Sequence, residues 1–475
     1  MAESSLPLNN IAPNNTSIDL ESLAADVVAL AMKAGASDAE AVAREGDEFS
    51  VNVRMGEVET LKESGSRGLG LRVFLGQRSG SASTSDLTAE GIRLLVEGAL
   101  ALARVTEEDP FIGLPEMAEF GPVNTRMTGD DLHLYYEDVY SLAGLERIEW
   151  ARRAEAAALA VDPRITNSDG GSFDAATGRK ALANSRGFVG GYRTSYATVA
   201  AAPLAVDANG KMQRDGWWSS ARSFAHLDSP EAVGVEASKR ALRRLGARRV
   251  ATQRVPIVFA PETARSLVGS VFEAASGDAI WRGASFLAGK LGETIAAPGL
   301  TVVDDNTMLL PTGAGGFGTS PFDGEGLPSL RTLLVENGVL RNYLLNTYAA
   351  RKLGMKSTHN AARGLAGAPG IGCGNLHLQP GILTPDQIIA EVPAGLYVTS
   401  LMGFGVNIVT GDYSRGATGL WIENGQLTHA VEEVTIAGNL GEMLCGVTAI
   451  GNDLVFRGAV AAPTLRIDGM TIAGA

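Results

Sequence analysis

The chain has 475 residues, and its 53 acidic and 40 basic side chains give a net charge of −13 when histidine is neutral. This length is enough for two or three domains, and the shares of 45% hydrophobic and 20% charged residues exclude a disordered protein. The acidic balance argues against nucleic acid as a direct ligand, because phosphate backbones are bound by clustered Lys and Arg. One short basic patch, from Lys239 to Arg249, is interpreted as the solvated face of a helix. Contact with an anionic partner is the alternative.

The sequence also bears on the cellular compartment. Two cysteines, Cys373 and Cys445, are too few to cross-link a chain of this size, and they fit a reducing compartment. The N-terminal segment has no basic start followed by an apolar core, so it does not resemble a secretory signal. No uninterrupted apolar run approaches the ~20 residues that a membrane span requires. We therefore expect a cytoplasmic protein without membrane contact.

The first half of the chain is predicted to be an N-terminal α/β domain over residues 18–250, preceded by a flexible leader at 1–17 that is rich in Asn and Pro. Apolar residues at helical spacing predict helices at 19–33, 88–104 and 136–160. Alternating apolar and polar residues on both sides of Met55-Gly56 predict a β-hairpin. The segment 107–132 is rich in Pro, Gly and Asp and is predicted to be a surface linker.

The second half, residues 251–475, is predicted to be a β-rich C-terminal domain. Asn-Gly pairs at 337–338 and 424–425 favour hairpin turns, and Asp468-Gly469 predicts one more near the C-terminus. The 58 glycines fit a structure with many tight turns. Because strands are expected to pair through hairpins rather than helical crossovers, the predicted fold class is α+β, with an α/β portion followed by a β-rich portion built from hairpins.

Residue chemistry alone does not identify an active site. Gly313-Ala314-Gly315-Gly316-Phe317-Gly318 matches the dinucleotide pattern G-x-G-x-x-G by letter, but the residues that follow cannot begin a long helix. The segment is therefore interpreted as a plain glycine loop. The five histidines are widely spaced and no H-E-x-x-H string occurs, so spacing predicts no metal site.

Several longer strings resemble a known protein family. The segments 56–76, 320–340, 348–363 and 401–425 are similar to the TldD/PmbA family of modulators of DNA gyrase, and the C-terminal strings most resemble its TldE/PmbA branch. The resemblance extends over roughly residues 20–475. It implies a cytosolic proteolytic system in which TldD-type and TldE-type subunits together form a metallopeptidase that acts on unfolded peptides.

The same resemblance implies that the family's metal site is lost from this chain. In TldD-type subunits an H-E-x-x-x-H segment and a cysteine near the C-terminus hold the metal, and the ligand positions correspond here to Val268, Glu273 and about Ala449. Apolar residues at helical spacing also predict a packed helix here: Ala264, Leu267, Val268, Val271, Phe272 and Ala275. The resemblance therefore implies no catalytic residue and no cofactor in this chain, with zinc expected in a TldD-like partner.

We expect a TldE/PmbA-like subunit that acts with a TldD-like partner on unfolded peptides. One alternative is an independent hydrolase that uses another site, such as the polar loop 410–416, in which Asp412 and Arg415 bind a peptide terminus or backbone. A structural turn held by an Asp412–Arg415 ion pair is the simpler interpretation of that loop. Another alternative is a non-enzymatic, homodimeric binding protein. Apolar segments such as 396–404 predict an oligomer interface in the last ~200 residues.

Overall fold

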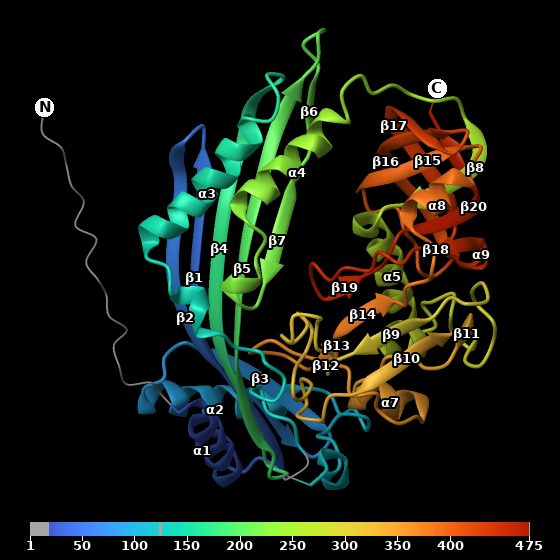
Figure 1. The fold of residues 1–475 in the computed structure, drawn as a ribbon. Helices are drawn as coiled ribbons and strands as arrows, with labels where there is room; N and C mark the ends of the chain where they lie inside the picture. The colour runs from blue at the N-terminus through green and yellow to red at the C-terminus, as the bar shows by residue number, and fades with distance from the viewer. Residues whose placement is uncertain (1–18, 123–125, 475) are drawn as a thin grey trace, which may run out of the picture.

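The computed structural model describes residues 19–122 and 126–474, so the predicted leader at 1–17 lies outside the described residues. The chain forms an N-terminal sheet with its helices and, beside it, a C-terminal body (Figure 1). Among the described residues the N-terminal sheet has seven strands, in the order β3-β2-β1-β4-β5-β6, and β7 pairs with β5. All its pairings are antiparallel.

The strands of this sheet are β1 (Asp38–Arg54), β2 (Glu57–Leu75), β3 (Arg78–Thr84), β4 (Ile165–Asn184), β5 (Val189–Val206), β6 (Met212–Arg214) and β7 (Trp217–Ala221). Its helices are α1 (Leu20–Lys33), α2 (Ala89–Val105), α3 (Gly144–Leu159) and α4 (Pro230–Leu242), with short 3-10 turns at Met117–Phe120, Glu137–Tyr140 and Phe224–His226. The helix predicted at 136–160 is thus divided into the 3-10 turn Glu137–Tyr140 and the helix α3. Helix α3 begins after Ala143, whose backbone N–H donates to the Glu146 carboxylate. The hairpin predicted at Met55-Gly56 is confirmed.

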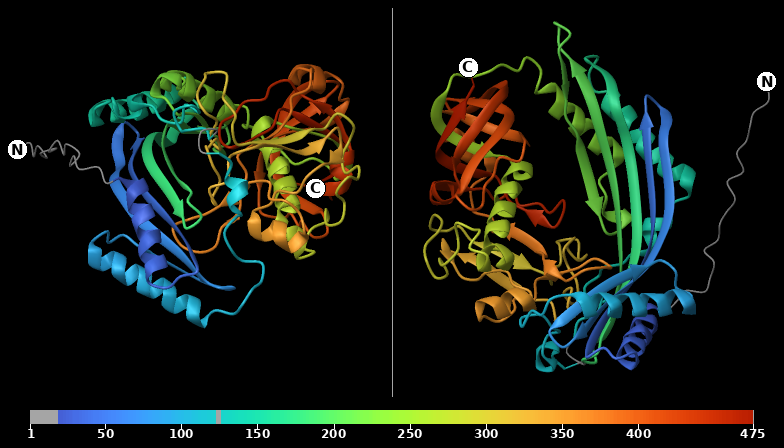
Figure 2. Two further views of the ribbon diagram at one scale, coloured as in Figure 1. Left: turned by 90° about the horizontal axis from the view of Figure 1, so that it is seen from below. Right: turned by 180° about the vertical axis from the view of Figure 1, so that it is seen from behind.

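The alternation of side chains along β1 decides which face of the sheet is covered. Ala41 at one end of the strand and Val51 at the other point to the same face, because both lie at odd-numbered positions. Ala41 packs under α1 and α2, and Val51 packs under α3 and α4, so all four helices cover this face. The other face of the sheet is turned to the C-terminal body (Figure 2). Glu40, Val42 and Arg44 on this face contact that body.

The C-terminal body contains two larger sheets and a two-stranded one in the described part of the chain. A six-stranded sheet has the order β17-β16-β15-β8-β20-β18, and a five-stranded sheet has the order β11-β10-β9-β14-β19. The six-stranded sheet is formed by β8 (Gln253–Phe259), β15 (Ala394–Met402), β16 (Asp412–Glu423), β17 (Gln426–Asn439), β18 (Val447–Ile450) and β20 (Leu465–Ala473). The five-stranded sheet is formed by β9 (Val302–Asp305), β10 (Arg331–Glu336), β11 (Val339–Leu340), β14 (Asn375–Leu378) and β19 (Val460–Ala461).

The strands β12 (Ala361–Ala362) and β13 (Gly370–Ile371) form a two-stranded sheet. The helices of this body are α5 (Pro261–Ala275), α6 (Gly277–Trp281), α7 (Thr347–Leu353), α8 (Pro385–Ala390) and α9 (Leu440–Cys445). Helix α5 lies between the two larger sheets and contributes to the largest apolar core. None of the helices in the described residues is long and apolar enough to cross a membrane.

The predicted α+β class is confirmed, with two differences in the C-terminal body. The turns at Asn337-Gly338 and Asn424-Gly425 connect hairpins as expected. The hairpin predicted at Asp468-Gly469 is wrong: Gly469, with φ of +79°, forms a bulge inside β20, which pairs with β8 on both sides of it. In addition, β15 pairs with β8 in parallel, so hairpins do not build the whole sheet.

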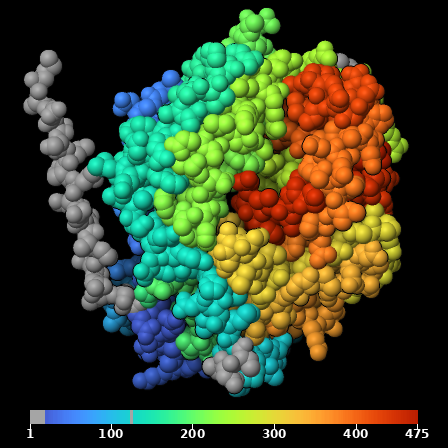
Figure 3. Space-filling model, viewed as in Figure 1, coloured from blue at the N-terminus to red at the C-terminus, as the bar shows by residue number. Residues whose placement is uncertain are grey.

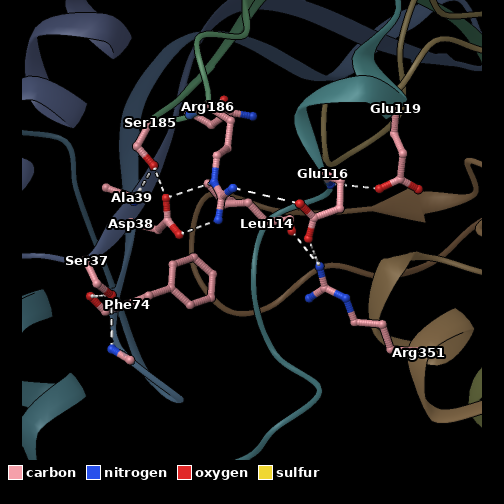
Figure 4. Close-up of polar contacts among 12 residues, drawn as sticks. Ser37, Asp38, Ala39, Phe74, Leu114, Glu116, Glu119, Ser185, Arg186 and Arg351 are labelled. Atoms are coloured by element: carbon pink, nitrogen blue, oxygen red, sulfur yellow. Dashed lines mark hydrogen bonds and ion pairs between the residues drawn. The ribbon is translucent and has the colours of Figure 1, made fainter.

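The predicted linker at 107–132 fastens the two parts of the molecule to each other at one end. Glu116 lies between Arg186 of the sheet turn and Arg351 of α7, at 4.0 and 3.8 Å, and Arg186 also forms an ion pair with Asp38 at 2.9 Å (Figure 4). The Arg351 guanidinium donates to the Leu114 carbonyl at 2.7 Å. An apolar cluster closes the same end between the two parts: Val42, Phe120, Leu182, Phe188, Phe322 and Leu327.

Candidate functional site

The inner face of the N-terminal sheet and the C-terminal body enclose a polar cavity of about 370 Å³. A second cavity of about 410 Å³ extends from it over β1 at residues 44–48, and the two share Lys180, Tyr192, Thr194 and Tyr196. We call the two cavities together the interdomain groove. The molecular surface is also hollowed elsewhere along the same boundary, between the green and dark red segments (Figure 3). Both volumes lie in the range of ligand pockets.

Lys180 projects from β4 into both cavities of the groove. Its ammonium lies 5.9 Å from the ring of Tyr192 and 6.0 Å from that of Phe322. Burial lowers the pKa of Lys180 to about 8, and the like charges of Arg44 and Arg363 act in the same direction. Among the described residues, its ammonium has no hydrogen bond or ion pair with a protein group.

Arg222 fixes the wall of the groove that faces Lys180. Its guanidinium donates to the carbonyls of Gly315 at 2.8 Å and Gly316 at 2.7 Å, and to two further carbonyls at 3.3 Å. The glycines allow a close approach, because a Cβ at Gly318 would lie 2.3 Å from the backbone of Gly374. The G-x-G-x-x-G string at 313–318 is therefore the glycine loop that the sequence predicted, and no helix follows it.

Three buried carboxyl groups support the loops on the C-terminal side. Asp323 accepts hydrogen bonds from the N–H groups of Glu325, Leu327 and Ala361, and burial raises its pKa. Burial and the neighbouring Asp323 also raise the pKa of Glu325. Burial raises the pKa of Asp304 to about 6. These groups hold the loops in place and carry less negative charge than surface carboxylates do.

An ion-pair network closes the groove on the side of Glu40. The Glu40 carboxylate contacts Arg363 at 2.8 Å and Arg72 at 3.2 Å, and all three side chains are buried. Arg44 donates to the carbonyl of Arg363 at 2.5 Å. These contacts join β1 to the loop after β12, so both arginines that flank Lys180 already have protein partners.

Helix α5 also lies along the boundary between the two parts. Glu262 in its first turn forms an ion pair with Arg240 of α4 at 3.2 Å, and a cavity of about 260 Å³ lies beside it. Further along the helix, Val268 is only 4% exposed in the apolar core, whereas Glu273 is exposed to solvent. The helix predicted from the apolar stripe is therefore present, and the stripe packs.

Comparison with known proteins identifies the family. Family models described as PmbA/TldA metallopeptidase domain 1, central domain and C-terminal domain match residues 39–103, 138–245 and 252–474. The chain is 37% identical over 447 residues, 94% of each chain, to "Metalloprotease PmbA" of Escherichia coli O157:H7. It is 35% identical to the homologue in Haemophilus influenzae, again over 94% of each chain. The chain belongs to the PmbA/TldD family.

Solved structures agree with this membership. A modulator of DNA gyrase from Bacteroides thetaiotaomicron is 27% identical, with a TM-score of 0.86 over 96% of this chain and 99% of the other. TldE from Thermococcus kodakarensis, at 21% identity, has the same fold with a TM-score of 0.80 over 94% of this chain and 99% of the other. The family that the sequence strings resembled is thus confirmed.

A metal ion does not fit the residues at the positions where the resemblance places the family's ligands. Val268 has no donor atom and is packed in the core, and Glu273 on the same helix is exposed. Ala449 of β18 lies opposite Arg466 of β20, so its side chain is on the other face of the sheet from Leu465. Leu465 and Val268 belong to one apolar cluster, whereas Ala449 belongs to another that also contains residues of α8. The structure therefore does not bring Ala449 to Val268. Within residues 19–122 and 126–474, no three His, Cys, Asp or Glu side chains are arranged to hold a metal ion.

The polar loop at 410–416 differs from its prediction. Asp412 begins β16, and its carboxylate accepts from the Thr410 hydroxyl at 2.7 Å. Arg415 lies three positions along the same strand and therefore on the opposite face. No ion pair joins them in the described part of the chain, so the turn held by an ion pair is wrong. The structure also does not bring the two side chains together as one binding site.

The residues that line the groove were missed by sequence reasoning. Lys180 occurs within a strand between Gly178 and Ala181, where its charge gives no indication of which face it occupies. Arg222 lies outside every motif. The Asp323-Gly324-Glu325 string gave the only available signal, two acidic residues in a glycine-rich loop that packs against a sheet.

Proposed function

We propose that this chain is a TldE-type subunit of a cytoplasmic TldD/TldE-type metalloprotease that hydrolyses unfolded peptides, and that a TldD-like partner supplies the metal site. The observation that carries the proposal is the packing of Val268 in the apolar core of α5, at the position where the family's first histidine ligand is expected. A zinc-bound water needs three protein ligands and an open position. This helix offers one exposed carboxylate.

The exposed surface supports a partner. Phe404 is fully exposed and Met402 is 54% exposed at the end of β15, and Val409 is 52% exposed in the following loop. By contrast, Leu396 and Val398 of the same apolar segment are buried in the core. A cluster of exposed large apolar side chains is typical of a protein interface. We propose that this corner of the C-terminal body contacts the TldD-like subunit.

The interdomain groove supports a peptide substrate. Its sheet wall carries small or polar side chains, such as Ala176, Thr194 and the 44% exposed Tyr196, rather than a packed apolar layer. An extended chain needs such a surface, because its backbone groups must find polar partners when they leave water. In this proposal the groove holds the substrate, and the bond is cleaved at the partner's metal.

The proposal is tested by assaying cleavage of a fluorogenic unfolded peptide by this chain, by a TldD-like chain and by their mixture. We expect appreciable cleavage only in the mixture, and the Glu273→Ala variant should retain nearly all of it. Cleavage by this chain alone would overturn the proposal, and so would loss of activity in Glu273→Ala while the complex still forms. Elemental analysis gives an independent readout, because a tightly bound metal ion in this chain alone contradicts the proposal.

A further inference from the structure

Lys180 differs from the other cations that face the interdomain groove. Arg222 donates to carbonyls of the glycine loop, Arg363 pairs with Glu40, and Arg44 donates to a backbone carbonyl. The Lys180 ammonium lines both cavities without a hydrogen bond or ion pair in the described residues. A part-buried cation without a partner is costly, and a bound anion removes that cost.

Five basic residues and three acidic residues line the interdomain groove, so it has an excess of positive charge. Glu45 is paired with Arg179 at 3.2 Å, and Glu48 lies at the far end of the second cavity. Arg44 and Arg363 approach from β1 and from the loop after β12, and Asp323 is the acidic group that faces Lys180 from the C-terminal side. The Asp323 carboxylate is already engaged by three backbone N–H groups, and burial raises its pKa. Burial also raises the pKa of Tyr192, so its hydroxyl stays protonated. An anionic ligand group is therefore favoured.

The shape of the groove indicates which part of a ligand reaches Lys180. On the side of Glu40 and Val42 the two parts of the chain are in direct contact through the Arg363 ion pair and the apolar cluster. On the other side the groove continues over the sheet past Tyr196 toward Glu48. A peptide that runs along the sheet from this open side meets Lys180 at the point where these contacts close the groove along β4, and we place its end there.

We propose that Lys180 binds the C-terminal carboxylate of an unfolded peptide that lies along the inner face of the sheet. The inference rests on the proposed function for the nature of the substrate, and it assigns the direction in which that substrate lies. An aspartate or glutamate side chain offers the same chemical group, so the experiment must separate the two sources of the carboxylate.

The test measures binding of three fluorescent decapeptides to this chain alone: an alanine- and serine-rich peptide with a free C-terminus, its C-terminal amide, and the same amide with one internal glutamate. We expect the free acid to bind about tenfold more tightly than the plain amide, because a charged hydrogen-bonded pair replaces a neutral one. Equal affinities for acid and amide would overturn the proposal. An internal glutamate that restores tight binding to the amide would overturn the assignment to the C-terminus.

Variants assign the preference to the side chain. Lys180→Met should remove the preference for the acid, and Lys180→Arg should keep it. Lys62→Met is the matched control, because Lys62 is an exposed lysine of the same sheet that lies outside both cavities, and it should bind like the wild type. An acid preference that persists in Lys180→Met overturns the proposal. If the mixture with a TldD-like chain cleaves nothing while the preference is present, the proposed function fails and the site remains.

Discussion

The inner face of the N-terminal sheet and helix α5 lie along the same boundary, but they have opposite chemistry. The sheet side of the groove contains ionisable groups, among them Lys180 and Arg44, and the pKa of Lys180 is strongly lowered. Helix α5 presents an apolar stripe to its core, with Val268 at its centre, and its charged residues Glu262, Arg265 and Glu273 lie outside that stripe.

This difference shows that the two regions depend on different kinds of contact. The packing of α5 requires apolar side chains at helical spacing, a condition that valine satisfies and a polar ligand residue does not. The loops around the groove instead depend on specific polar contacts, such as those of Arg222 and Asp323. Substitutions in the two regions should therefore have different consequences.

The largest effect is expected at Arg222, which supports the groove wall. Arg222→Met removes hydrogen bonds to four backbone carbonyls. The carbonyls of Leu134 and Gly316 keep a second donor, whereas those of Gly315 and Phe317 lose theirs. We expect the free energy of unfolding to fall by about 3 kcal/mol. Urea denaturation measures this loss. Arg193→Met is the control, because Arg193 is an exposed arginine of β5 and should change stability little. Similar losses in the two variants would show that the glycine loop does not depend on Arg222.

A smaller loss is expected when a ligand residue is placed on α5. Val268→His puts a polar ring into the packed core, and we expect a loss of about 1–3 kcal/mol in the free energy of unfolding. Glu273→His on the same helix is the control, because that position is exposed and tolerates a polar ring. If Val268→His is as stable as the wild type, the core around α5 accommodates a histidine side chain. The difference between the polar groove and the apolar helix is then smaller than the structure indicates.

The pH dependence of peptide binding tests the groove half of the comparison with α5. The pKa of Lys180 is lowered to about 8 by burial and by Arg44 and Arg363, while Asp323 opposes this. The ammonium therefore loses its proton as the pH rises through this value, and the preference for the acid over the amide peptide should fall. We expect about tenfold preference near pH 7 to decline above about pH 8, as measured by fluorescence anisotropy. A bound carboxylate favours the ammonium, so the midpoint of the decline should lie somewhat above 8.

A preference that stays constant to pH 10, the range of an ordinary lysine, would contradict a buried location for the amine. Lys180→Arg provides the control, because a guanidinium stays protonated over this range and should show a constant preference.

The sequence predicted those elements that depend on local patterns. The helices at 19–33 and 88–104 have apolar residues at regular spacing and capping residues, Asp19 and Thr88, whose side chains accept from backbone N–H groups. The Asp468-Gly469 turn failed for a physical reason. An Asp-Gly pair suits a bulge as well as a hairpin, and only the pairing of β20 with β8 on both sides decides between them.

The candidate site could be predicted only in part. The resemblance implies a loss of family ligands at Val268 and Glu273, which stays a prediction, whereas the packed helix predicted from the apolar stripe is present. The groove does not follow from any pattern, because Lys180, Arg222 and Asp323 come from segments that meet only after the sheet and the C-terminal body have packed. The face on which a strand residue lies is fixed by register, which the sequence of one strand does not reveal.

The smallest expected effect concerns Gly269, next to Val268 on α5. A Cβ at this position meets nothing within 4 Å, and the residue lies in the interior of α5, away from both helix ends. Gly269→Ala should therefore raise the free energy of unfolding by about 0.5–1 kcal/mol, because alanine loses less backbone entropy than glycine. Urea denaturation of the chain alone measures this gain. Val268→Ala is the informative control, since it removes buried methyl groups one position away and should destabilise the protein. If both variants destabilise the chain, a Cβ at position 269 is not accommodated in solution. The space beside Gly269 is then not open, and the side of α5 opposite its apolar stripe also makes contacts.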